Sequence, residues 1–376
     1  MNYQLQIFDT PLIRFSLEYE NLKGIVCSVL WSDDSNAALF PIGMQFTDAG
    51  VLSWLRSRTI PKNRHYVQSI LASMQLREND LIGLLNVCMG LSLNDSYWVV
   101  PEGFSGTFAE YNLYDNDFSK ALSLIAYVGH GSVRARGFTS SPEFTTNGML
   151  RKGWRRIGGQ TLLYKGGTEG ASNAGNEPFS EFYAAQIANA MGLNHVPYSL
   201  ASWKKSICSV CPLFTDKEHA YVPIWRFGEF TTIVDIADYL KSLGDSFFED
   251  FVDMMVFDAL IYNTDRHQGN FGLLVDLTTN KPYALAPIFD NGLGLFPYAV
   301  QEDIENLNAY AQTRSSAFQI PFDEIVQEYI SDRQRKQLRK VLTFRFERDR
   351  NYNLSAKRIR ALESFIQGRA RQLLEM

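Results

Sequence analysis

The 376-residue chain has few cysteines, no long apolar run and no excess of positive charge. Four cysteines cannot form the disulfide framework of a small secreted protein. The C-x-x-C pair Cys208 and Cys211 has no second pair of ligands to complete a zinc site. We expect buried, inert thiols rather than a redox motif, because this pair lies in an apolar run that ends in Pro212 and not at the start of a helix.

Two further absences concern location and partners. No apolar run approaches the roughly 18 residues that span a bilayer, and the first residues lack the basic start and apolar core of a signal peptide. The formal net charge of -5 disfavours a globally basic nucleic-acid-binding protein. The sequence therefore predicts a cytoplasmic protein with no membrane association and no direct binding of nucleic acid.

The composition is that of a chain with sizeable cores, because 45% of its residues are apolar and 20% are charged. At about 150 residues per domain, the length predicts two to three domains. We place an N-terminal accessory α/β domain at 1–112, a strand-rich part at 113–222 and a helical part at 223–376. A strand-rich part followed by a helix-rich part indicates two lobes with a cleft between them.

Periodicity and turn residues predict the individual elements. In the first domain we expect strands such as 24–31, and helices that begin near Asp48, at Pro61 and near Leu81. The middle part is expected to hold strands at 121–128 and 207–214, a hairpin at 154–165 that turns at Gly158 and Gly159, and a helix from Glu177 to Gly192. After residue 230 we expect mainly helices, including 247–261, with a short strand at 273–275.

A polar segment from Asn263 to Gly272, placed between an apolar helix and a short apolar strand, carries the strongest chemical signal. Asp265 and Asn270 are five residues apart, which is the spacing of the base and the metal-binding asparagine in the catalytic loop of kinases. A carboxylate can accept the proton of an attacking hydroxyl, and an amide oxygen can bind Mg²⁺ without adding charge. Such loops often hold catalytic groups.

A second carboxylate, Asp290, follows an apolar segment that we predict to be a strand, and precedes Asn291 and Gly292. It is typical of the metal-binding aspartate of a D-x-G motif, and Asn270 with Asp290 would suffice for Mg²⁺ beside phosphate oxygens. Alone, each of these motifs is more often a structural turn. Their order and spacing together favour a phosphotransferase site.

Residues upstream fit the same interpretation. Lys165 ends a predicted strand and could reach the α and β phosphates of ATP. Glu181, in the next predicted helix, could pair with Lys165, and Glu177 is its rival one turn earlier. Backbone amides of the loop before the hairpin could cover phosphates, with Arg151 adding positive charge nearby. The loop residues assigned to nucleotide binding are Thr145, Thr146, Asn147, Gly148 and Lys152.

With these residues in order, the chain resembles the HipA-like serine/threonine kinases, and most closely their CtkA-type branch. The resemblance runs from about Thr145 to about Leu342. It implies an α+β, two-lobed protein-kinase-like fold and an ATP- and Mg²⁺-dependent protein kinase that acts on serine or threonine. Asp265 would be the base and Lys165 would contact ATP. Asn270 and Asp290 would hold the metal, and the backbone from Cys211 through Leu213 to Phe214 would meet adenine. His267 completes the predicted nucleotide site.

The same resemblance implies regulation and partners. In the HipA-like family a serine of the phosphate loop is autophosphorylated, and Thr145 stands at the matching position. Hydroxyls after Asp290, namely Thr313, Ser315 and Ser316, are alternative sites. HipA-like proteins often act as toxins beside an antitoxin, so a toxin-like or regulatory kinase of the bacterial cytoplasm with an antitoxin partner is expected. Secretion or delivery into a host stays open.

Two other functions compete with this one. Arg266 stands where many HipA proteins have glycine, and D-R-H-x-x-N also occurs in phosphatidylinositol kinases, so a lipid kinase is the alternative. The negative net charge and the lack of a lipid-insertion helix disfavour it. The third hypothesis is a non-catalytic interaction protein on a kinase-like scaffold. It does not explain why Lys165, Asp265, Asn270 and Asp290 are all present.

Residues 332–376 hold thirteen Lys or Arg against five Asp or Glu, which gives this stretch a charge of +8. One interpretation is a surface that binds phosphate backbones or an acidic partner. We favour helices that pack on an acidic part of the protein itself.

Overall fold

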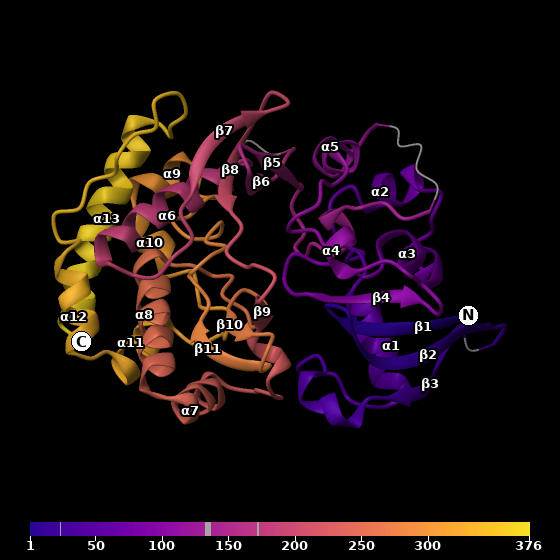
Figure 1. Ribbon diagram of the computed structural model, residues 1–376. Helices are drawn as coiled ribbons and strands as arrows, with labels where there is room; N and C mark the ends of the chain where they lie inside the picture. Colours follow the sequence, from indigo (N-terminus) through magenta and orange to yellow (C-terminus); the bar gives the residue numbers. More distant parts are fainter. Residues whose placement is uncertain (23, 132–136, 171–172) are drawn as a thin grey trace. The chain divides into compact units, whose positions relative to one another are not determined.

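The computed structural model describes residues 1–22, 24–131, 137–170 and 173–376 (Figure 1). The chain divides into two compact units, each made of several segments. The N-terminal unit comprises Met1–Tyr164, Leu213–Val222 and Leu274–Tyr283, and the C-terminal unit comprises Lys165–Pro212, Pro223–Leu273 and Ala284–Met376. The domain boundaries predicted after residues 112 and 222 stay predictions.

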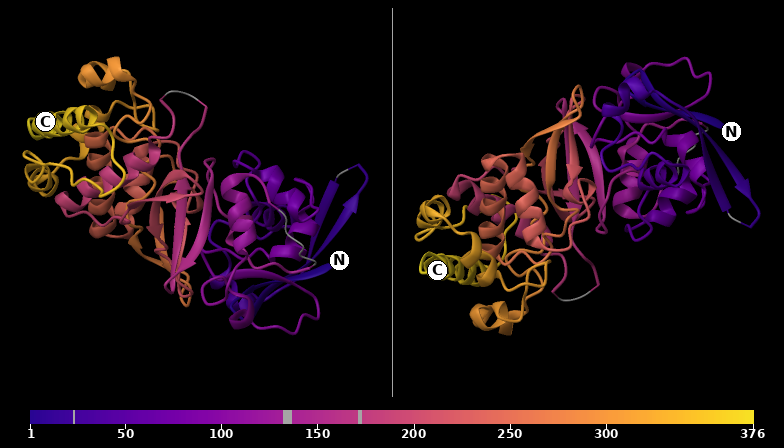
Figure 2. Two further views of the ribbon diagram at one scale, coloured as in Figure 1. Left: turned by 90° about the horizontal axis from the view of Figure 1, so that it is seen from above. Right: turned by 90° about the horizontal axis from the view of Figure 1, so that it is seen from below.

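The N-terminal unit begins with an antiparallel sheet of strand order β3-β2-β1-β4. Its strands are β1 Asn2–Ile7, β2 Thr10–Glu20, β3 Gly24–Ser32 and β4 Tyr97–Pro101. Successive side chains of a strand point to opposite faces, and in β1 the side chains of Tyr3, Leu5 and Ile7 are buried. The strands expected near the start of the chain are confirmed, and Figure 2 shows them side by side near the marked N-terminus.

The helices of this unit are short. They are η1 Asp34–Leu39, α1 Asp48–Ser57, α2 Val67–Ser73, α3 Leu81–Cys88, α4 Phe108–Tyr111, α5 Lys120–Val128 and η2 Pro142–Phe144. The helix expected to begin at Pro61 begins only at Val67. The strand predicted at 121–128 is wrong, because α5 occupies this range. The Ser119 hydroxyl accepts the Leu122 amide at 3.2 Å, and Gly129 ends the helix with φ +79°. Periodicity alone does not separate a short buried helix from a buried strand.

The predicted hairpin is present, with β5 Lys152–Ile157 and β6 Gln160–Gly166. Gly158 and Gly159 have φ values of +59° and +80°, which glycine adopts without steric cost in a tight turn. Two further sheets have the strand orders β5-β6-β8-β7 and β11-β10-β9. Their other strands are β7 Ser199–Trp203, β8 Ser206–Pro212, β9 His219–Pro223, β10 Gly272–Asp276 and β11 Lys281–Leu285.

The core of the C-terminal unit forms around α8, which contacts α7, α11, α12 and α13 (Figure 1). The helices are α6 Glu177–Met191, η3 Ile224–Arg226, α7 Ile233–Leu243, α8 Asp245–Ile261, α9 Gln301–Glu305, α10 Leu307–Ala311, α11 Phe322–Tyr329, α12 Asp332–Arg339 and α13 Ala356–Leu374. The predicted helices 177–192 and 247–261 and the strand 273–275 are thus confirmed. Among the described helices, none is both long and apolar enough to cross a bilayer.

The strand predicted immediately before Asp290 is wrong. β11 ends at Leu285, and Ile288 forms only an isolated parallel bridge with His195. The Val196 amide donates to the Ile288 carbonyl, and the Ile288 amide donates to the Asn194 carbonyl, both at 2.9 Å. Asp290 is therefore placed by a short two-bond contact rather than by a strand.

Candidate active site

Lys165 lies near the end of β6, and its partner Glu181 lies on α6. Its Nζ donates to Glu181 Oε1 on α6 and to Asp290 Oδ1, the latter at 2.5 Å. The Ser209 hydroxyl on β8 donates to the second oxygen of the Glu181 carboxylate. The ion pair predicted between Lys165 and Glu181 is therefore present, and Asp290 joins it.

The charge of Lys165 is maintained although the side chain is buried. Burial by itself would lower the pKa of the ammonium, but the carboxylates of Asp290 and Glu181 more than offset this and raise it. The lysine is thus a fixed positive charge, held between two carboxylates.

Glu177, the rival of Glu181, has other partners. Its two oxygens accept the Thr168 amide at 3.2 and 3.3 Å, and one of them accepts the Tyr298 hydroxyl at 2.7 Å. The structure therefore assigns the lysine contact to Glu181. Glu177 instead connects the start of α6 to Thr168, which precedes the helix, and to Tyr298, which lies much later in the sequence.

Asp265 and Asn270 lie together in the loop after α8. The Asn270 Nδ2 donates to the Asp265 carbonyl at 2.9 Å and to the carboxylate Oδ2 at 3.3 Å. Backbone bonds of 2.8 Å, from His267 N to Asp265 O and from Asn270 N to His267 O, close the loop. Since the Asn270 amino group faces Asp265, its amide oxygen is the atom left to accept a metal ion.

The carboxyl of Asp265 is partly buried, and burial raises its pKa. The nearby His267 lowers this pKa, and the negative charge of Asp290 raises it. A raised pKa makes a carboxylate a better proton acceptor near neutral pH. The His267 ring itself is exposed, and its Nδ1 accepts the Gly269 amide at 3.0 Å, so it braces the loop.

Asp290 has the left-handed backbone conformation, with φ +56°, which is uncommon outside glycine. Its amide donates to the Tyr198 hydroxyl at 3.2 Å. Its side chain is 31% exposed although Lys165 contacts it. The backbone of Asp290 is thus fixed by its bond to Tyr198, while its carboxylate contacts Lys165 and is partly exposed to solvent.

The buried pair of Arg266 and Asp258 was not predicted from the sequence. The Arg266 Nε and Nη2 donate to the two carboxylate oxygens of Asp258 at 2.8 and 3.0 Å. Asn263 donates to the same carboxylate at 3.1 Å and accepts the Asp265 amide at 3.2 Å. A signal was available, because Asp258 is the one charged residue in the otherwise apolar run 254–261. A charge there needs a buried partner.

The predicted phosphate loop lies in the N-terminal unit. The hydroxyls of its two threonines donate to backbone carbonyls of the same unit. The Thr145 Oγ1 donates to the Leu91 carbonyl at 2.8 Å. The Thr146 Oγ1 donates to the Pro142 carbonyl at 2.7 Å and accepts the Trp154 indole N–H at 2.9 Å. Thr145 is buried, so its hydroxyl is not presented to solvent.

Lys152 turns back onto the same loop. Its Nζ donates to the Asn147 carbonyl at 2.8 Å. Gly148 has φ +91°, and a Cβ at this position would lie 2.3 Å from the Lys152 Nζ. Glycine is therefore favoured by the backbone conformation, and a Cβ here would also displace the end of the Lys152 side chain. The predicted members of the loop do lie together.

Arg64 anchors this loop from a distant part of the chain. Its guanidinium forms an ion pair with Glu143, and both side chains have 0% exposure. The same guanidinium donates to the carbonyls of Thr146 and Lys152, each at 3.3 Å. The other oxygen of Glu143 accepts the Trp154 amide at 2.8 Å.

The predicted adenine-binding segment follows the end of β8. Burial raises the pKa of the Cys211 thiol to about 12, which agrees with an inert thiol. The Leu213 amide donates to the Thr161 carbonyl at 3.0 Å, and the Phe214 ring packs edge-to-face on Tyr221. Adenine contacts by this segment stay a prediction.

The segment after Asp290 is tied to α13. Arg358 donates to the Ala299 carbonyl at 2.9 Å and to the carbonyls of Phe296 and Pro297 at 2.5 and 3.3 Å. Tyr298, which lies within this segment, is the residue that contacts Glu177. The C-terminal helix thus supports the segment that leaves the candidate metal site.

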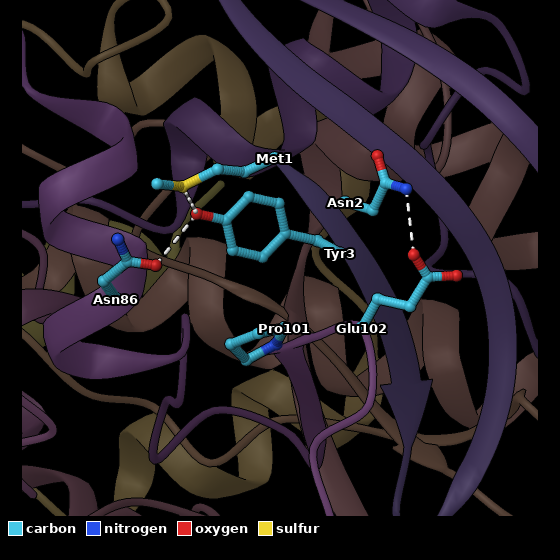
Figure 3. Close-up of a pocket in the computed structure, with 6 residues that line it drawn as sticks. All are labelled: Met1, Asn2, Tyr3, Asn86, Pro101 and Glu102. Carbon is cyan, nitrogen blue, oxygen red and sulfur yellow. Dashed lines mark hydrogen bonds between the residues drawn. The ribbon is translucent and has the colours of Figure 1, made fainter.

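A pocket of about 440 Å³ lies in the N-terminal unit, at the start of β1 (Figure 3). The Tyr3 hydroxyl donates to Asn86 Oδ1 at 2.8 Å, and Asn2 Nδ2 donates to Glu102 Oε2 at 2.9 Å. None of the predicted site residues lines it.

Several known proteins are similar to this chain. The serine/threonine-protein kinase CtkA of Helicobacter pylori (strain J99 / ATCC 700824) is 32% identical over 158 residues, which cover 36% of this chain and 47% of CtkA. The match thus spans about half the length of that relative. A crystal structure of the H. pylori proinflammatory kinase CtkA matches with a TM-score of 0.51 and 21% identity, covering 61% of this chain and 90% of that chain.

A second solved structure extends over the whole chain. HipA of Shewanella oneidensis MR-1, in complex with HipB and its operator DNA, matches with a TM-score of 0.53 and 11% identity, covering 100% of this chain and 98% of that chain. The chain therefore has the kinase-like fold that the sequence predicted. Residues 145–343, more than half of the chain, match the HipA-like C-terminal domain. The chain belongs to the HipA-like C-terminal domain family.

Proposed function

We propose that this protein is an ATP- and Mg²⁺-dependent protein kinase of HipA type that phosphorylates serine or threonine. The observation that carries this proposal is the contact of Lys165 with both Glu181 and Asp290, in the same unit as the Asp265–Asn270 pair. Kinases use a lysine paired with a helix glutamate, together with a D-x-G aspartate for the metal, to place a nucleotide. Family membership and the similarity to CtkA support the same activity.

In this mechanism Asp265 accepts the proton of the substrate hydroxyl while the hydroxyl oxygen attacks the γ-phosphorus. The bond from that phosphorus to the β–γ bridging oxygen breaks, and ADP leaves. The raised pKa of Asp265 suits proton transfer near neutral pH. Asn270 orients the carboxylate through its bond to Oδ2. Positioning and charge neutralisation supply most of the catalysis.

The donor set fits Mg²⁺. Asp290 offers one carboxylate that is partly open to solvent, and Asn270 offers one amide oxygen. Mg²⁺ usually takes one or two carboxylates with waters and phosphate oxygens, so these two residues would hold it. When bound, the ion would neutralise phosphate charge. Lys165 is already fixed beside Asp290 and would contact phosphate oxygens there.

Asp265→Asn tests the assignment of the base. We expect phosphoryl transfer to fall by about 10²- to 10⁴-fold, with the folded state and nucleotide binding retained. Transfer of radiolabelled phosphate to protein extract measures the rate, and calorimetry with ATP analogue and Mg²⁺ measures binding. Asp238→Asn, an exposed aspartate of α7, is the matched control. Full activity of Asp265→Asn would disprove the role, and transfer to phosphoinositide vesicles alone would favour a lipid kinase.

Autophosphorylation belongs to the same proposal. The Thr145 hydroxyl is buried on the Leu91 carbonyl, whereas Thr313 and Ser315 are exposed. We therefore expect Thr313 and Ser315 to be phosphorylated before Thr145. The Thr145 hydroxyl becomes accessible only when its loop opens. Site mapping by mass spectrometry during incubation with ATP and Mg²⁺ gives the order. A phosphate found first on Thr145 would contradict it.

We also propose a protein partner, since the structurally similar HipA of S. oneidensis is in a complex with HipB and operator DNA. The basic C-terminal stretch gives little support to direct DNA binding. Two of its arginines form ion pairs within the protein: Arg333 pairs with Glu249, Asp250 and Asp253, and Arg369 pairs with Asp323. An antitoxin-type protein acting in the bacterial cytoplasm is the partner we expect, and co-purification tests it.

A further inference from the structure

Arg266 is one of the most deeply buried charged side chains of the protein, with 2% exposure, and all three of its guanidinium nitrogens donate hydrogen bonds. Two of these bonds go to Asp258, as described above. The remaining bonds go to the two segments that carry the candidate metal ligands. Arg266 therefore contacts the catalytic loop and the D-x-G segment at the same time.

The Nη1 atom makes the contact that joins the two segments. It donates to the carbonyl of Asn270 at 3.0 Å and to the carbonyl of Phe289 at 2.5 Å. Asn270 is one proposed metal ligand, and Phe289 directly precedes the other, Asp290. One nitrogen atom thus sets the separation of the two backbones from which both ligands extend.

The Nη2 atom adds a second contact on the same side. It donates to Asn291 Oδ1 at 2.5 Å as well as to Asp258. Asn291 is 1% exposed and directly follows Asp290. Arg266 therefore contacts the residues on both sides of Asp290, which explains how a residue with left-handed backbone geometry is held in place.

Asp258 explains why the guanidinium is rigid. Its two oxygens accept two parallel N–H bonds, so the plane of the guanidinium is fixed relative to the end of α8. The carboxylate also balances the positive charge, which would otherwise oppose a cation nearby. Lysine could not replace this function, because an ammonium lacks the planar set of donors that reaches three segments.

We propose that Arg266, fixed by Asp258, is the positioning residue that sets the distance between the Asn270 and Asp290 ligands and so determines the affinity of the site for magnesium–nucleotide. The proposal rests on the proposed function, because it assigns the metal to these two ligands. It goes beyond that function by giving a specific task to a residue that is assigned neither as the base nor as a metal ligand.

Arg266→Lys and Asn291→Ala test the proposal. The first keeps a cation beside Asp258 but loses the planar donors, and the second removes one acceptor while Asp258, Arg266 and Asp290 remain. We expect the Mg²⁺ concentration for half-maximal transfer to rise about 10- to 100-fold in Arg266→Lys, as for other residues that orient metal ligands, and less in Asn291→Ala. Calorimetric affinity for Mg²⁺ with a non-hydrolysable ATP analogue should fall in parallel.

Arg369→Lys is the matched control. Arg369 is also a buried arginine of the C-terminal unit, where it pairs with Asp323 and donates to the Ala259 carbonyl at 3.2 Å. We expect a loss of thermal stability in this variant with an unchanged Mg²⁺ requirement. A change in Mg²⁺ requirement as large as that of Arg266→Lys would show a merely structural effect and overturn the proposal.

Two further results separate the proposals. Wild-type Mg²⁺ affinity in both Arg266→Lys and Asn291→Ala would overturn the positioning role, and if Arg266→Lys does not fold, Asn291→Ala decides. Absence of phosphoryl transfer by the wild-type protein would overturn the kinase function instead. In that case the calorimetric affinities still support or overturn the positioning role, because they need no turnover.

Discussion

Two buried arginine–carboxylate pairs, one in each unit, hold the predicted phosphate loop and the predicted catalytic loop. Arg64 pairs with Glu143 in the N-terminal unit and also donates to carbonyls of the 145–152 loop. Arg266 pairs with Asp258 in the C-terminal unit and also donates to carbonyls around the catalytic loop. The chemistry is the same, but the partners are 79 residues apart in the first pair and eight apart in the second.

The difference in sequence separation changes what each pair depends on. The second pair joins the end of a helix to the loop that follows it, so much of its geometry comes from local structure. The first pair forms only after the N-terminal region has folded against the loop. A buried ion pair is costly to desolvate and adds little net stability compared with apolar residues, so both pairs are better understood as fixing geometry.

The largest expected effect is on stability when one arginine is removed. Arg64→Met and Arg266→Met each leave a buried carboxylate without its positively charged partner, which should lower the free energy of unfolding by about 3–5 kcal/mol. Denaturant titration measures this. Arg56→Met, an exposed position on α1, serves as the control and should change little.

Variants in which both members of a pair are replaced by apolar residues separate the effect on stability from the effect on the Mg²⁺ requirement. Arg64→Met with Glu143→Leu, and Arg266→Met with Asp258→Leu, should each regain a large part of the lost stability. Only the second double variant should keep a strongly raised Mg²⁺ requirement. An equal change of Mg²⁺ requirement in both would contradict the distinction drawn between the two pairs.

A smaller effect is expected from single hydroxyls. Tyr198→Phe leaves the partly buried Asp290 amide without its acceptor and should cost about 1–3 kcal/mol. Thr145→Val removes the donor to the Leu91 carbonyl and should cost about 1 kcal/mol. Thermal or chemical unfolding measures both. A larger loss for Thr145→Val than for Tyr198→Phe would reverse the expected order.

The smallest effect concerns the thiols. Burial raises the pKa of Cys88 to about 11 and that of Cys211 to about 12, so at pH 8 the reactive thiolate is scarce in both units. Since thiolate forms only as pH rises toward these values, alkylation of the native protein should be slow at pH 8 and faster at higher pH. Addition of Mg²⁺ and an ATP analogue should slow the labelling of Cys211 and leave that of Cys88 unchanged.

Much of the site could be predicted from the sequence because its chemical groups lie at fixed short spacings. Asp265 and Asn270 share one loop, and Lys165 and Glu181 lie on adjacent elements, so pattern and spacing were sufficient. The contact of Lys165 with Asp290 agrees with the expected order of motifs, although the strand predicted before Asp290 is only a single bridge.

What could not be predicted depends on contacts between distant segments. Nothing in the sequence near Glu143 points to Arg64, and no local pattern shows that Arg266 reaches Phe289. The error in secondary structure at 121–128 has a local cause instead. The burial of that run is evident from its composition, whereas its helical form depends on the caps at Ser119 and Gly129.

The three bonds from Arg358 to the carbonyls of residues 296, 297 and 299 have a practical consequence. They make the final helix part of the support of the chain that follows Asp290. Shortening the polypeptide before Ala356, or fusing a bulky tag that pulls α13 away, would leave these carbonyls without their donor.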